Sequence, residues 1–147
     1  MAVEEWATDK FNHTFDPPVP WLISTESRHC GIGWGIAVDI GGSCVNAKQV
    51  YAHEYFHHIQ RDLRQSLRLP DWYTEGTARY VDTLFSVYVG EGSYNARRGT
   101  WVRAAKNFPG RLSDRDLVEH YGPSYYMGAP ATERLVALAG ESSYYEL

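Results

Sequence analysis

The pattern of apolar and polar positions changes near residue 46 of this chain of 147 residues. Before that point, the proline cluster at residues 17–20 disfavours helix, and the apolar segment Trp21–Ser24 predicts a short strand. Trp34–Ile40 alternates, is rich in β-branched residues and is bounded by glycines on both sides, which predicts a second strand. We therefore expect residues 1–46 to form a small β-rich part.

After residue 46 the pattern is that of helices. The segment Lys48–Leu67 has the composition and spacing of a helix, and Pro70 ends it because proline disfavours helix at the residue before it. Asp71 is a favourable N-cap for a second helix that runs from Trp72 towards Tyr88. The sequence thus predicts two consecutive helices joined by a short turn.

The C-terminal part is also expected to be mostly helical. Ser113 can cap a helix over Asp114–His120, and a last helix is predicted over Gly128–Leu138, ended by Gly140. A hydrophobic content of 44 % in a chain of this length is enough for one core. We expect a single domain over residues 1–147 of the α+β class, mostly helical from residue 47 onwards, with a small N-terminal β-sheet.

The first predicted helix contains an HExxH motif made by His53, Glu54 and His57. Two histidines four positions apart on a helix lie on one face, one turn from each other. Both imidazoles can therefore reach one zinc ion, and Glu54 can take a proton from a water molecule at that ion.

A catalytic zinc site needs a third protein ligand and an open position. Glu75 lies near the start of the second predicted helix, and a helix–turn–helix hairpin can bring it over the face that carries His53 and His57. Asp82 competes for this role from about two turns further along. Each ligating histidine should also donate its other ring N–H to a carboxylate or carbonyl group, and Asp82 is one possible partner. His58 points about 100° away from His57 around the helix and is not expected to be a ligand.

These motifs resemble those of the gluzincin-type zinc metallopeptidases, of the peptidase MA-like families. In those families the HExxH helix is followed by a segment similar to Pro-x-Trp-x-x-Glu-Gly-x-Ala-x-Tyr. The matching residues here are Pro70, Trp72, Glu75, Gly76, Ala78 and Tyr80. The resemblance covers about residues 50–82. It implies a zincin-like catalytic domain, a Zn²⁺ cofactor held by His53, His57 and Glu75, and a peptide or protein substrate.

The resemblance also implies two features outside the helix pair. Gluzincins have an edge strand before the zinc helix that pairs with extended substrate, so Trp34–Ile40 is either such a strand or an ordinary strand without a ligand. A weaker resemblance covers Tyr125–Ala129, where these families carry a tyrosine that helps to hold the oxyanion. Because Gly128 follows three residues after Tyr125, that tyrosine matches better than Tyr126, and His120 is a minor candidate.

The expected reaction is hydrolysis of a peptide bond by a zinc-activated water, with Glu54 as the general base and Tyr125 as an oxyanion donor. The alternative is a catalytically inactive metal-binding or scaffold module on a peptidase-like fold. The presence of all three ligands together with Glu54 favours the enzyme.

Charge and cysteine content limit the remaining possibilities. The net charge of −4 shows no basic patch, which argues against nucleic acid as a partner, and no apolar run reaches the roughly 18 residues of a transmembrane segment. Cys30 and Cys44 are not at zinc-ligand spacing and allow either a disulfide or two reduced thiols. Exported peptidase domains of this type favour the disulfide and an extracellular location. The sequence does not specify the oligomeric state.

Overall fold

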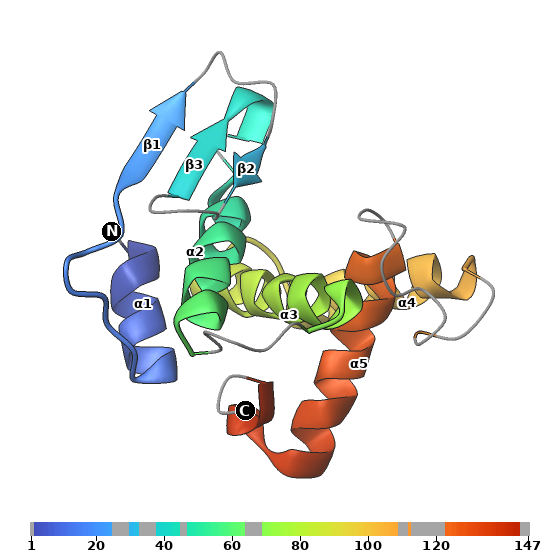
Figure 1. Ribbon diagram of the computed structural model, residues 1–147. Coiled ribbons are helices and arrows are strands. Elements are labelled where there is room, and N and C mark those ends of the chain that lie inside the picture. Colours follow the sequence, from blue (N-terminus) through green and yellow to red (C-terminus); the bar gives the residue numbers. More distant parts are fainter. Residues whose placement is uncertain are drawn as a thin grey trace.

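The computed structural model of the chain describes residues 2–24, 30–32, 38–44, 47–63, 69–108, 112 and 123–144. A small sheet lies at one end of helix α2 (Lys48–Leu63), and helix α1 (Ala2–Phe11) lies beside α2 (Figure 1). Helix α3 (Asp71–Tyr88) packs against α2, and it also packs against α4 (Tyr94–Lys106) and α5 (Pro123–Ala139). The expected α+β class, mostly helical with a small N-terminal sheet, is confirmed.

The sheet has three strands in the order β1-β3-β2. Strand β1 (Trp21–Ser24) pairs in parallel with β3 (Val38–Gly41), and β2 (Gly31–Ile32) pairs antiparallel with the other side of β3. The prediction of a strand at residues 21–24 is confirmed. The predicted strand over 34–40 is described from residue 38 only, and residues 34–37 lie outside the described part. Over its described residues the strand does not lie at the edge of the sheet, because β2 pairs with the second side of β3. Of the two alternatives, the ordinary strand therefore holds for residues 38–40.

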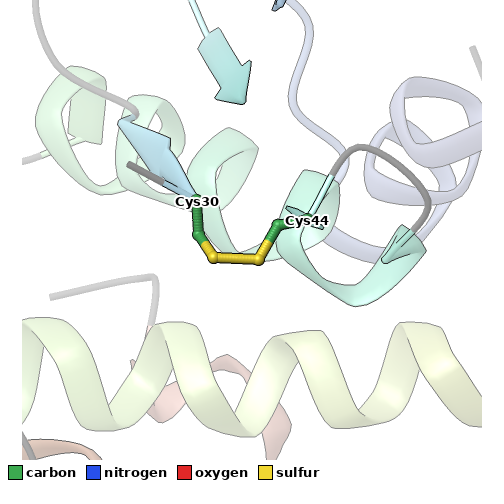
Figure 2. Close-up of a disulfide and its surroundings, with 2 residues drawn as sticks. All are labelled: Cys30 and Cys44. Atoms are coloured by element: carbon green, nitrogen blue, oxygen red, sulfur yellow. A yellow bond between two sulfur atoms is a disulfide. The ribbon is translucent and has the colours of Figure 1, made fainter. Parts of the chain in front are cut away.

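A disulfide between Cys30 and Cys44 joins the beginning of β2 to the end of the short helix η1 (Gly42–Cys44) (Figure 2). The backbone N–H of Gly41 also donates to the carbonyl oxygen of Cys30 at 3.0 Å. Of the two states that the sequence allowed, the structure therefore has the disulfide, and it closes the segment directly before α2.

Helix α1 was not predicted within the β-rich part. Its buried residues Val3, Trp6, Ala7 and Phe11 recur at helical spacing, although acidic residues between them hide the pattern. The ring of Phe11 lies 5.3 Å from that of Phe56 on α2, and the ring of Trp6 lies 5.2 Å from that of Phe85 on α3. The helix forms because both neighbours offer it an aromatic surface, which a local reading of the sequence does not reveal.

The predicted boundary between the two long helices is nearly correct. Helix α3 begins at Asp71, but the N-cap is Pro70 and not Asp71. The backbone of Pro70 is extended, and its carbonyl oxygen accepts from the N–H groups of Tyr73 and Thr74 at 2.9 and 3.1 Å. Asp71 is the first helical residue, where its carboxylate is favoured by the helix dipole. Residues 64–68, where the first helix was expected to continue, lie outside the described part.

The last helix is longer than predicted. Helix α5 begins at Pro123, five positions before Gly128, because proline is favourable in the first helical turn. It ends at Ala139, and Gly140 terminates it as predicted, with a φ of +92° that favours glycine. The helix expected over residues 114–120, with Ser113 and His120, lies outside the described part. No helix of the described part is long and apolar enough to cross a membrane.

Candidate metal centre

Helix α2 carries the two histidines of the HExxH motif on one face. His53 is buried and His57 is half-buried, and their ring centroids lie 4.8 Å apart with the ring planes at 88°. This arrangement is the direct result of a separation of four residues on a continuous helix. The two Nε2 atoms both face α3.

Glu75, in the second turn of α3, meets both histidines. Its Oε2 atom lies 3.3 Å from Nε2 of His53 and 3.5 Å from Nε2 of His57. Within the described part of the chain, these three residues are the one group of histidine, cysteine or acidic side chains whose ligand atoms converge. The structure therefore brings together the three residues that were predicted as metal ligands.

Asp82 does not compete with Glu75 for the same place. Its Oδ2 atom lies 3.3 Å from Nδ1 of His53, the ring nitrogen that faces away from Glu75. The carboxylate is only 1 % exposed, and it accepts from Nη1 of Arg79 at 2.9 Å and from the hydroxyl of Thr83 at 3.2 Å. Asp82 thus orients His53 through the ring nitrogen opposite Glu75. A carboxylate in this position is a usual partner of a metal-binding imidazole.

His57 has a partner of a different kind, and sequence analysis missed it. Nδ1 of His57 lies 2.8 Å from Oε1 of Gln60, one turn further along α2. The other end of this amide contacts α3, where Nε2 donates to the carbonyl oxygen of Thr74 at 2.9 Å. The spacing of three residues after His57 was the available signal, because such residues are neighbours on a helix surface.

Without a bound metal, the histidines and the carboxylates of the centre stabilise each other's ionised forms. Burial disfavours the charged form of His53, but its contacts with Asp82 and Glu75 outweigh burial and raise its pKa to about 10. Burial would raise the pKa of Glu75, but its contacts with His53 and His57 lower that pKa well below its usual range. The site therefore holds an ionised carboxylate against at least one imidazolium, and a divalent cation can replace the proton.

Glu54 is buried beside the first histidine, with 8 % of its surface exposed. Its charge contributes to the raised pKa of His53, so it lies within electrostatic reach of the centre. Tyr125 belongs to the first turn of α5, but its side chain lies outside the described part. Tyr126 is half-buried and packs against the hydrophobic core.

The other histidines of the described part do not join the centre. His58 is buried on another side of α2, where its Nδ1 accepts from Nη2 of Arg61 at 2.8 Å. Nε2 of His13 lies 3.1 Å from Oδ2 of Asp62. The converging group of the described residues consists of His53, His57 and Glu75.

Comparison with known proteins supports the fold. No protein-family model and no curated protein sequence matches the chain. Among solved structures, the chain is similar to the crystal structure of an M1 zinc metallopeptidase E323A mutant from Deinococcus radiodurans, with a TM-score of 0.66 and 18 % identity. The match covers 99 % of this chain but only 34 % of that one, so the chain spans about a third of the length of this neighbour. The chain has a zinc peptidase-like fold with a candidate His–His–Glu metal centre.

Proposed function

We propose that this chain is a zinc-dependent metallopeptidase domain of the gluzincin type that hydrolyses peptide bonds. The observation that carries the proposal is the convergence of His53 Nε2, His57 Nε2 and Glu75 Oε2 at one point between α2 and α3. The similar fold of a zinc metallopeptidase supports it.

The two distances from Glu75 are close to those expected at a zinc ion, and all three ligand atoms lie within 4.8 Å of one another. Ligands that each lie about 2.0–2.1 Å from a tetrahedral ion are about 3.3–3.4 Å apart. The distances from Glu75 Oε2 to the two histidine Nε2 atoms are 3.3 and 3.5 Å. Two imidazoles and one carboxylate are a ligand set of catalytic zinc sites, which keep a further position for water or substrate.

When bound, zinc supplies a Lewis acid that lowers the pKa of water to about 7 and polarises a carbonyl group. His53, His57 and Glu75 would hold the ion, and Asp82, 3.3 Å from Nδ1 of His53, would keep the His53 ring in place. Glu54 accepts a proton from the attacking water and then donates it to the leaving amine. Tyr125 donates a hydrogen bond to the developing oxyanion.

The compartment is part of the proposal. A disulfide such as Cys30–Cys44 persists in oxidising surroundings, so we place the protein outside the cytosol. A peptide or protein is the proposed substrate.

Metal content and peptide cleavage test the proposal together. Elemental analysis is expected to find about one zinc per wild-type chain and almost none in Glu75→Ala, because that variant loses one of three ligands. A mixture of internally quenched peptides is expected to be cleaved by the wild type. Glu54→Gln is expected to keep the metal and to lose cleavage.

Two results would contradict the proposal in different ways. A wild-type chain that binds zinc but leaves every peptide intact would be a metal-binding module without turnover. A chain that does not bind zinc would show that the converging ligand atoms do not form a zinc site. The peptidase assignment would then fail as well.

A further inference from the structure

Gln60 is a buried polar side chain, 4 % exposed, that contacts both helices of the metal centre. On α2 its Oε1 atom lies 2.8 Å from Nδ1 of His57. On α3 its Nε2 atom contacts the carbonyl oxygen of Thr74 and the hydroxyl of Thr77. Thr74 directly precedes Glu75, so one amide connects the second histidine to the chain segment that carries the third ligand.

The contacts on α3 determine which way the amide faces. The carbonyl oxygen of Thr74 can only accept a hydrogen bond, so the amide atom opposite it, 2.9 Å away, must be the NH₂ group. The hydroxyl of Thr77 donates its own proton to the carbonyl oxygen of Tyr73 at 2.6 Å, which leaves its lone pairs free to accept from Gln60. Both donor hydrogens of the amide are thereby used on α3.

The orientation of the amide then determines the state of His57. The amide oxygen can only accept, so the Nδ1 atom that faces it must carry a hydrogen. In neutral His57 the lone pair consequently lies on Nε2, the nitrogen 3.5 Å from Oε2 of Glu75. The reversed amide would place two acceptors together at Thr74. It would also favour the opposite tautomer of His57, with its hydrogen on the nitrogen that should bind the metal.

We propose that Gln60 is a positioning residue that holds His57 in the Nδ1–H tautomer and fixes it relative to Glu75 through Thr74 and Thr77. This inference rests on the proposed function, because it assigns His57 Nε2 to the metal. The two histidines are then oriented by different means: His53 by a buried carboxylate, and His57 by a neutral amide whose direction is set from the neighbouring helix. Partners of this kind commonly contribute roughly 10–100-fold to metal affinity.

The test combines zinc affinity with a nuclear magnetic resonance signature. Zinc affinity is measured by competition with a chromophoric chelator for wild type, Gln60→Met and Thr132→Val. Methionine has a similar length but makes no comparable hydrogen bond. Thr132 is a suitable control because it is a buried threonine on α5 whose hydroxyl donates within its own helix, to the carbonyl oxygen of Gly128 at 3.0 Å. Long-range ¹H–¹⁵N correlation spectra then report which His57 nitrogen carries the hydrogen.

We expect Gln60→Met to weaken zinc binding roughly 10–100-fold, and Thr132→Val to leave it unchanged. In the zinc-loaded wild type, His57 is expected to bind through Nε2 and to show an Nδ1–H resonance protected from exchange, which Gln60→Met loses. Equal zinc affinity in Gln60→Met, or zinc on Nδ1 of His57, would overturn the inference. If Gln60→Met does not fold, the wild-type spectrum alone decides between the two tautomers.

Failure of the proposed function would look different. A wild-type chain that takes up no zinc contradicts the metal centre, whereas the amide orientation is still tested in the metal-free protein. There a protected Nδ1–H of His57 supports the orientation of Gln60, and an Nδ1 without hydrogen contradicts it.

Discussion

Gly76 and Gly128 meet backbone to backbone where α3 crosses α5. A Cβ atom at Gly76 would overlap the backbone of Gly128, and a Cβ atom at Gly128 would overlap the carbonyl oxygen of Trp72 and the Cα atom of Gly76. This contact lies directly after Glu75. The absence of two side chains therefore lets α5 approach the part of α3 that carries the third ligand.

Gly128→Ala is expected to separate α3 from α5 and to cost about 1–3 kcal/mol of unfolding free energy, as overpacking commonly does. Zinc affinity should fall as well, since Glu75 adjoins the displaced backbone. Gly99→Ala on α4 is the control. A Cβ there meets only the flexible end of Arg103 at 3.3 Å, so the change should stabilise the helix by about 0.5–1 kcal/mol. Urea unfolding measures the unfolding free energy of both variants. Equal stability of Gly128→Ala and wild type would contradict the close contact between Gly76 and Gly128.

Asp82→Asn is expected to weaken zinc binding by roughly 10-fold or more, because His53 loses the buried charge behind its Nδ1 atom. The variant keeps an oxygen that can accept from His53, so the measurement isolates the charge. Asp62→Asn is the matched control, since Asp62 lies on α2 near His13 and away from the centre. Chelator competition gives both affinities, and similar losses in the two variants would indicate a general effect of net charge.

Zinc binding is expected to release a proton from His53 at neutral pH. The pKa of this imidazole is raised from 6.5 to about 10 in the metal-free protein, whereas a metal ligand must be neutral. The apparent zinc affinity should therefore rise with pH between about 7 and 10, by up to tenfold per unit. Calorimetric titration in buffers of different ionisation enthalpy counts the protons. An affinity that is independent of pH in this range would contradict the raised pKa.

The same pKa predicts how the stability of the metal-free protein changes with pH. Because the folded-state pKa of His53 lies above the unfolded value of about 6.5, its contribution is complete below that value and is lost as the pH rises through about 10. Glu75 has the opposite sign: its lowered pKa contributes stability at neutral pH that is lost in strong acid. In Asp82→Asn the loss of stability at alkaline pH should be smaller, since the main charge that raises the pKa of His53 is absent.

Tyr125→Phe is expected to lower kcat by roughly 10²–10³ while the zinc content stays unchanged, if its hydroxyl supports the oxyanion. Tyr126→Phe is the comparison. Because Tyr126 packs against the core, this variant should cleave peptides at nearly the wild-type rate. A loss of rate confined to Tyr126→Phe would transfer the role to that residue. Unchanged kcat in both variants would mean that neither tyrosine holds the oxyanion.

Replacing Cys30 and Cys44 by alanine is expected to cost about 2–4 kcal/mol of unfolding free energy, because the disulfide closes a loop between residues 14 positions apart. Zinc content should not change, as neither cysteine belongs to the converging group. Thiol titration of the unfolded, unreduced wild type should find no free thiol. Detection of both thiols in freshly isolated protein would contradict the disulfide and the oxidising compartment.

Local rules were sufficient for the parts of this protein that depend on one stretch of chain. The common face of His53 and His57 follows from helix geometry alone, and the helix boundaries near Pro70 and Gly140 follow from the backbone preferences of proline and glycine. The motif around Glu75 also singled out the residue that completes the converging group. Each of these inferences requires only the spacing of neighbouring residues.

Tertiary structure decided what depends on distant segments. The roles of Asp82 and Gln60 behind the two histidines require the packing of α2 against α3. The central place of β3 requires β2 on its second side, and α1 forms where aromatic rings from α2 and α3 cover its apolar face. Hydrogen-bond partners and sheet order are properties of elements brought together by burial, and sequence spacing alone does not encode which elements meet.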